Sequence, residues 1–88
     1  MPETEEIRRK RLRFRSWHRG TRELDLMLGR FADRHIDGLT TEQLDRYEAL
    51  TDQPDPDIYR WISGADAPPA AHDNDVMEMI KKFKVHLE

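Results

Sequence analysis

The sequence predicts an all-α protein, a compact bundle of four to five short helices that forms a single domain over residues 1–88. Apolar residues recur at intervals of three and four through most of the chain, which is the spacing of one helix face. No segment of strand length alternates apolar and polar residues. Short stretches with glycine, proline or asparagine separate the periodic segments, as expected for helices that pack against their neighbours in the chain.

The first two predicted helices span residues 4–17 and 21–36. The first opens at Thr4 and carries Glu5 and Glu6 in its first turn, where the helix dipole stabilises carboxylates. Its apolar residues are sparse: Ile7, Leu12, Phe14 and Trp17. The second helix is closed by Asp37-Gly38. It has the strongest apolar stripe of the chain, made of Leu24, Met27, Leu28, Phe31 and Ala32.

The third predicted helix, residues 41–51, has a complete N-terminal signature. Thr40 can cap it, and Gln43 stands three residues later, as a capping box requires. Leu39 can pack onto Leu44 as a hydrophobic staple. The buried face of this helix is then formed by Leu44, Tyr47 and Leu50.

Two further helices complete the bundle. The fourth is short, with Asp55 as its expected cap, Pro56 at the first helical position and Gly64 at its end. Its inward-facing residues are Ile58, Trp61 and Ile62. Residues 65–74 form a proline-containing loop, and residues 1–6 are expected to be frayed. The fifth helix, residues 75–87, is capped by Asp73 or Asn74 and buries Val76, Ile80, Phe83 and Leu87.

The composition argues against several classes of protein. The chain has no cysteine, which removes disulfides, thiolate zinc sites and thiol nucleophiles. It contains neither a nucleophile-elbow pattern nor a glycine-rich phosphate loop, and its four histidines never stand four residues apart. We see no secretory signal and no apolar run long enough to span a membrane. We therefore expect a cytoplasmic, monomeric protein that is not an enzyme and binds no metal.

The charge is distributed unevenly along the chain. Residues 1–22 hold eight Arg or Lys against three Glu, a local charge of +5, and the remainder carries −8. The basic run "RRKRLRFR" at 8–15 can be a solvated helix face, a protein-binding patch that steers encounter, or a nucleic-acid contact with Phe14 and Trp17 as stacking side chains. The acidic remainder of the chain disfavours nucleic acid. A small helical nucleic-acid-binding or regulatory module is nevertheless the alternative function.

The segment "RGTRE" at 19–23 is the most informative short motif. Arg19 offers a planar guanidinium suited to a carboxylate or a cluster of carbonyls. Gly20 permits a positive φ and close approach of another backbone. Glu23 falls in the first turn of the second helix, with its side chain directed toward Arg19 or toward a partner. The segment is either a glycine hinge with an incidental Arg/Glu pair or the working surface of an interaction module.

The chain resembles the small FAD assembly factors of succinate dehydrogenase, the SdhE type, whose mitochondrial counterpart is succinate dehydrogenase assembly factor 2. The resemblance rests on "RRKRLRFRSWHRGTRELDLMLGRFADRH", which contains the RGxxE element, followed by "LTTEQLDRYEALTDQPDPDIYRWISG". It is close over residues 7–64, and the later "PPAAHDNDVMEMIKKFK" also fits. RGxxE alone is a weak signal, but joined to "ELDLMLGRF" and "DPDIYRWI" in this order it is a strong one.

This resemblance implies a helical bundle that binds the flavoprotein subunit of succinate dehydrogenase, and of related fumarate reductases, and promotes covalent attachment of FAD. It implies no stably bound cofactor, because FAD is inserted into the partner, and no nucleic-acid or membrane partner. Arg19, Gly20 and Glu23 match the motif needed for flavinylation. Further partner-binding residues implied by the resemblance are Arg8, Arg11, Asp25 and Tyr59. Tyr59 and Trp61 can belong either to the core or to the interface.

Overall fold

A computed structural model describes residues 3–85, with side-chain surroundings up to Phe83. This part of the chain forms five α-helices: α1 (Glu5–Trp17), α2 (Arg22–His35), α3 (Thr41–Thr51), α4 (Asp55–Ser63) and α5 (Asp75–Val85). Two 3-10 turns, η1 (Ile36–Gly38) and η2 (Ala70–His72), lie in the connections. The predicted all-α fold and its helical segments are confirmed; Leu87, expected on the last stripe, lies outside the described residues.

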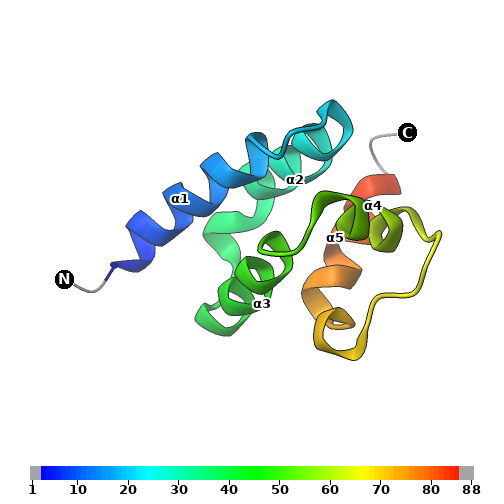
Figure 1. Cartoon of the computed structure of the whole chain (residues 1–88). Coiled ribbons are helices and arrows are strands. Elements are labelled where there is room, and N and C mark those ends of the chain that lie inside the picture. Colours follow the sequence, from blue (N-terminus) through cyan, green and yellow to red (C-terminus); the bar gives the residue numbers. More distant parts are fainter. Residues whose placement is uncertain (1–2, 86–88) are drawn as a thin grey trace.

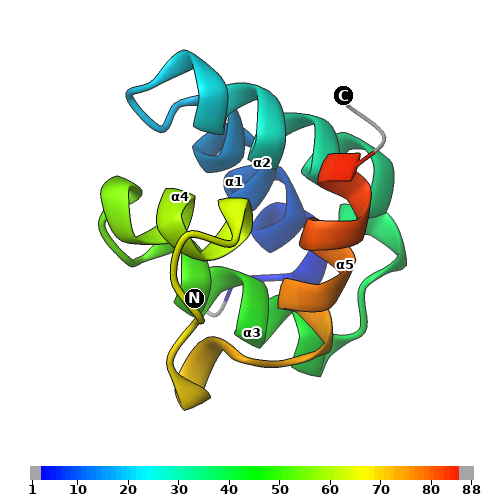
Figure 2. The same ribbon diagram turned by 90° about the vertical axis from the view of Figure 1, so that its right-hand side faces the viewer.

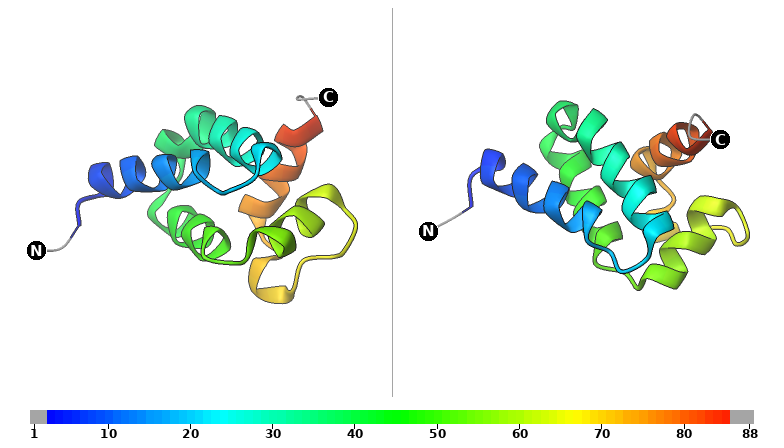
Figure 3. Two further views of the ribbon diagram at one scale, coloured as in Figure 1. Left: turned by 45° about the horizontal axis from the view of Figure 1, so that its top comes forward. Right: turned by 90° about the horizontal axis from the view of Figure 1, so that it is seen from above.

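The bundle is built around the hairpin of α1 and α2, which lie side by side (Figure 1). In the end-on view of Figure 2, α4 lies on the left, α3 below and α5 on the right, so that α3 packs on α1 and α5 packs on α2. The first turns of α1 project beyond the other helices (Figures 1 and 3). Residues far apart in the sequence are thereby brought to common surfaces, above all at the turn between α1 and α2.

The core is formed by the stripes that the periodicity predicts. In α2, Leu24, Leu28, Phe31 and Ala32 are fully buried, with Met27 partly buried against them. The other helices contribute Leu12, Leu44, Tyr47, Leu50, Ile58, Ile62, Val76, Met77 and Ile80. The first helix supplies little to this core because Ile7 and Phe14 are 55% and 64% exposed. Trp61 is half-buried against the core and stacks on His72 at a ring distance of 5.4 Å.

Side chains cap most of the helix starts where the sequence predicts them. Thr4 accepts a hydrogen bond from the Ile7 amide, and Thr40 with Gln43 forms the capping box. Asn74 accepts from the amide of Met77 at 3.1 Å and so caps α5.

The prediction that Asp55 caps α4 is wrong. Pro54 occupies the cap position without a side-chain hydrogen bond, Asp55 is the first helical residue and Pro56 the second. The carboxylate of Asp55 does not bond to its own helix because it binds the guanidinium of Arg19, 36 residues earlier. Gly64 ends α4 in the left-handed conformation, as predicted, whereas α2 is followed by the 3-10 turn η1, in which Gly38 does not have a positive φ.

The arginines of α1 are not a freely solvated face. Arg8 binds Asp45 and Glu48 of α3 at 2.7 and 2.9 Å, and Arg9 donates to the carbonyls of Ile36 and Leu39. Arg11, Arg13 and Arg15 also meet carboxylates. The positive charge of this helix therefore serves mainly to attach it to the acidic helices. None of the helices in residues 3–85 has the length and apolarity needed to cross a membrane.

Tyr47 leads to a prediction about pH. Its ring is fully buried, its hydroxyl lies 2.5 Å from that of Ser16, and burial raises the pKa of the phenol to about 12. The unfolded chain releases this proton near pH 10, whereas the folded chain keeps it up to about pH 12. The contribution of Tyr47 to the free energy of unfolding is therefore complete below pH 10 and is lost as the pH rises toward 12. We expect the free energy of unfolding to fall by up to about 2–3 kcal/mol over this range. Denaturant titrations should show that Tyr47→Phe removes this dependence and that Tyr59→Phe, at an exposed position, retains it.

Candidate functional site

The turn between α1 and α2 is fixed by Arg19. Its backbone amide donates to the Asp25 carboxylate at 2.6 Å, and its guanidinium donates to Asp55 Oδ1 at 2.7 and 3.1 Å and to the carbonyl of Gln53 at 3.3 Å. The Arg19 side chain is only 9% exposed. Figure 3 shows this turn beside the beginning of α4, where Asp55 lies. Arg19 thus ties the turn to α4 rather than presenting its charge to solvent, and Asp25 holds the backbone of the turn.

Gly20 lies exposed at the turn with φ of +119°, a conformation that other residues rarely adopt. A Cβ at this position would lie 3.5 Å from Asp55 Oδ2, which is ordinary contact. The backbone conformation, not crowding within the chain, therefore requires glycine here. The hinge hypothesis is correct about the backbone, and the exposed position also allows another backbone to approach.

Glu23 is the acidic residue of the motif. It is the second residue of α2, its side chain is exposed, and no ion pair to it is present within residues 3–83. Of the two orientations that the sequence leaves open, pairing with Arg19 does not occur because Asp55 binds that guanidinium. The Glu23 carboxylate therefore remains available to a partner.

Glu23 stands at the edge of a cleft of about 410 Å³ between α2 and α4, which we call the α2–α4 cleft. Apolar walls are supplied by Leu24, Pro56 and the half-exposed ring of Tyr59. The remaining lining residues are Thr21, Asp55 and Arg60. Arg60 is itself paired with Asp57 and Asp66. The cleft thus combines apolar surface with one unpaired carboxylate, a combination suited to a protein partner that presents an apolar side chain next to a hydrogen-bond donor.

The predicted residues divide into three groups in the structure. Glu23 and Tyr59 line the α2–α4 cleft, and Gly20 lies on the adjoining turn. Arg19 and Asp25 hold that turn from within. Arg8 and Arg11 lie earlier on α1, bound to carboxylates of α3 and to Glu3, and do not line the cleft; their contact with a partner stays a prediction.

The sequence analysis did not predict that Pro56 lines the α2–α4 cleft or that Asp55 binds Arg19. Both stand at the start of α4, where an Asp-Pro pair is equally typical of a helix cap. Only the packing of α4 beside the α1–α2 turn reveals that Asp55 faces Arg19. Within the part of the chain that the structure describes, no three His, Asp or Glu side chains are placed to hold a metal ion.

The Arg19–Asp55 pair leads to a prediction about stability. Removing one partner of a largely buried ion pair leaves the other charge unpaired, so Arg19→Ala should cost about 2 kcal/mol and lower the melting temperature by about 8–16 °C. Asp55→Ala should cost a similar amount, and the double variant clearly less than the sum. The exposed pair Arg46–Asp75 is the control, with an expected effect below about 1 kcal/mol. Additive effects of Arg19→Ala and Asp55→Ala in calorimetry would contradict the coupling.

Comparison with known proteins shows which family this chain is similar to. A family described as "Flavinator of succinate dehydrogenase" matches residues 10–84. Succinate dehydrogenase assembly factor 2, mitochondrial, of Meyerozyma guilliermondii is 40% identical over 84 residues, which are 91% of this chain and 62% of that protein. The protein of the same name from Debaryomyces hansenii is 48% identical over 61 residues, or 69% of this chain and 43% of that one.

A bacterial relative also matches. The FAD assembly factor SdhE of Acetobacter pasteurianus is 42% identical over 57 residues, or 65% of this chain and 52% of that protein. The alignments with these three curated relatives thus span between 43% and 62% of the relatives' own lengths.

Proposed function

The chain belongs to the family described as flavinator of succinate dehydrogenase, and on that basis we propose that it is an assembly factor for this enzyme. In this proposal it binds the flavoprotein subunit of succinate dehydrogenase and promotes covalent attachment of FAD to that subunit. The flavoprotein of fumarate reductase is proposed as a second partner. The chain acts as a monomer, and the cytoplasmic location stays a prediction, since the two yeast relatives are named as mitochondrial and the bacterial one is not.

The observation that carries the proposal is the unpaired carboxylate of Glu23 at the edge of the α2–α4 cleft. A charge-assisted hydrogen bond from this carboxylate, made beside the apolar surface of Tyr59 and Pro56, would give the contact both affinity and orientation. Arg19 supports the contact from within by fixing the turn against α4. Gly20 leaves room for the partner's backbone next to that turn.

We propose that the chain assists flavinylation without catalysing it. The covalent bond to FAD would form in the flavoprotein's own site, with no FAD held stably by this chain. The surface around Glu23 would stabilise the arrangement of the flavoprotein in which its reacting groups are aligned. Such positioning can lower a reaction barrier by several kcal/mol without any acid, base or nucleophile from the helper.

The alternative of a nucleic-acid-binding module receives less support from the geometry. Such a module would present the cations of α1 to phosphates, whereas Arg8, Arg9 and Arg11 are bound to carboxylates or backbone carbonyls of this chain. Competition for these internal partners would have to precede any phosphate contact. The same charges therefore fit an attachment of α1 to the bundle better than a phosphate-binding face.

Co-expression tests the proposed function. The flavoprotein subunit of succinate dehydrogenase is produced with and without this chain in a host that lacks its own assembly factor, and flavin fluorescence is read from the subunit band on a denaturing gel. We expect covalent flavin to rise severalfold when the chain is present. Equal fluorescence with and without the chain, at equal amounts of flavoprotein, would refute the proposal.

Gly20 leads to a prediction in the same assay, with Gly64 as a matched control. Both glycines have positive φ, +119° and +84°, and alanine would strain either backbone by about 1–3 kcal/mol. Only Gly20 adjoins the α2–α4 cleft; a Cβ at Gly64 would meet nothing within 4 Å. At a temperature where both variants are folded, we expect Gly20→Ala to reduce covalent flavin and Gly64→Ala to leave it unchanged. Equal amounts of covalent flavin with the two variants would show that Gly20 serves only the conformation of the turn and not the contact with the partner.

A further inference from the structure

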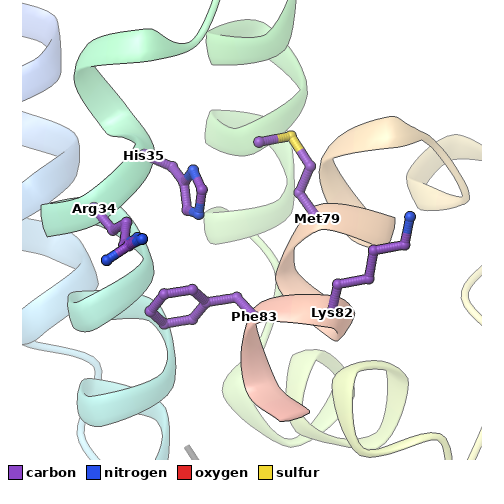
Figure 4. Close-up of a pocket in the computed structure, with 5 residues that line it drawn as sticks. All are labelled: Arg34, His35, Met79, Lys82 and Phe83. Atoms are coloured by element: carbon purple, nitrogen blue, oxygen red, sulfur yellow. The ribbon is translucent and has the colours of Figure 1, made fainter. Parts of the chain in front are cut away.

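A second concave surface lies at the opposite end of α2 from Glu23. It has a volume of about 560 Å³ and is lined by Arg34, His35, Met79, Lys82 and Phe83; we call it the α2–α5 groove. In Figure 4 the ring of Phe83 reaches from α5 toward α2, near Arg34 and His35, while Met79 and Lys82 extend on the α5 side. Eleven residues of helix separate Glu23 from Arg34, about 16 Å along the axis. The two concave surfaces are therefore distinct.

The charges of the α2–α5 groove are of one sign. Among the residues whose side chains the structure describes, two cations line it, Arg34 and Lys82, and no carboxylate does. Within residues 3–83, where side chains are described, neither cation has an ion-pair partner, although every arginine of α1 has one. The arginines of α1 are thus paired with carboxylates, whereas Arg34 and Lys82 are available beside a concavity.

The floor of the groove is aromatic and apolar. The His35 ring lies between Phe31 and Phe83, at ring distances of 5.0 and 5.6 Å. Burial, and secondarily the charge of Arg34, lower the pKa of His35, which favours the neutral ring. Phe83 and Met79 pack partly against the core and expose the rest of their surface to the groove. A ligand would therefore meet apolar surface between two cations.

We propose that the α2–α5 groove is a second docking site, which takes an acidic segment of the flavoprotein partner. A carboxylate of that segment lies against Arg34 and Lys82, and an adjoining large apolar side chain lies on Phe83 and Met79. This inference rests on the proposed function and adds to it a site of opposite charge from the α2–α4 cleft. A negative and a positive contact separated along one helix allow only one orientation of the partner.

Site-specific crosslinking tests which molecule occupies the groove. Because the chain has no cysteine, Lys82→Cys introduces a single thiol that can carry a benzophenone maleimide. Lys10→Cys, on the exposed side of α1, is the matched control. After irradiation with the flavoprotein subunit, we expect crosslinks from position 82 to a peptide that holds Asp or Glu next to a large apolar residue, and far fewer from position 10. A crosslinked peptide without an acidic residue, or one from a second copy of this chain, would overturn the proposal.

Affinity measurements test whether the charges of Arg34 and Lys82 contribute to binding of the flavoprotein subunit. Isothermal titration with the flavoprotein subunit should show that Arg34→Glu and Lys82→Glu each weaken binding about tenfold, less at high salt. Arg30→Glu is the control, since Arg30 is exposed on the same helix outside the groove, and it should change the affinity by no more than about twofold. If Arg30→Glu weakens binding equally, or if the groove variants bind like the unaltered chain, the inference fails while the proposed function stands. Absence of binding by the unaltered chain would refute both.

Discussion

Replacing Gly29 by alanine should lower the melting temperature by up to about 16 °C. An alanine Cβ at this buried position of α2 would lie 2.3 Å from Cδ2 of Trp17 and 2.5 Å from Cε2. Those atoms are the fused centre of the indole, so the whole ring would have to move, and with it the hydrogen bond from Trp17 Nε1 to Asp33. Overpacking of this kind costs about 1–3 kcal/mol, whereas alanine gains roughly 1 kcal/mol over glycine in a helix, so the net loss is up to about 2 kcal/mol. Each kcal/mol corresponds to about 4–8 °C for a domain of this size.

The sign of the effect should reverse when the indole is absent. A Trp17→Ala background removes the three indole atoms nearest to the new methyl, and Gly29→Ala should then stabilise the protein by up to about 1 kcal/mol through helix propensity. Gly38→Ala is a second control, because a Cβ there meets nothing within 4 Å and its φ is not positive. Thermal unfolding of the four combinations at positions 17 and 29 measures this coupling. Destabilisation by Gly29→Ala in both backgrounds would show that Trp17 is not the cause.

The helices could be predicted because their signals are local. The stripe from Leu24 to Ala32, the capping box of Thr40 and Gln43, and Gly64 at the end of α4 each depend on residues within one or two turns. Asp55 shows where this reasoning stops. An aspartate before a proline satisfies the same local pattern whether its carboxylate caps the helix or binds an arginine 36 residues away. Only the packing of the helices decides between the two.

The candidate site could be predicted in part. The RGxxE motif pointed to the turn and to Glu23, but the opposite wall of the α2–α4 cleft comes from α4, and its position beside the turn depends on tertiary packing. The basic run of α1 was ambiguous for the same reason, because the carboxylates that bind Arg8 are on α3. The contact between Trp17 and Gly29 joins two helices and leaves no periodic signal in the sequence.

Glu23→Gln should abolish most of the covalent flavinylation of the partner while leaving this chain folded. The substitution keeps the shape of the side chain and removes the single unpaired carboxylate of the α2–α4 cleft. Its cost to stability is small, about 0.3–1 kcal/mol, because the carboxylate acts on its own chain only through the dipole of α2. Loss of a charge-assisted hydrogen bond to a partner costs more, about 1.5–3 kcal/mol, which corresponds to roughly a 10- to 150-fold loss of affinity. Covalent flavin should therefore fall sharply when the chain is produced at limiting amounts and recover partly when it is in excess.

Glu42 provides the control that separates this effect from helix stability. It is the second residue of α3, as Glu23 is of α2, and it is likewise exposed after a threonine cap. Glu42→Gln should change the melting temperature as little as Glu23→Gln does and leave flavinylation intact, because its carboxylate lines neither of the two concave surfaces. Circular dichroism establishes that both variants are folded, and flavin fluorescence of the partner on a denaturing gel gives the result. If the partner carries equal amounts of covalent flavin with the two variants, the free carboxylate of Glu23 contributes nothing to docking. The α2–α4 cleft then has no role in recognition of the partner.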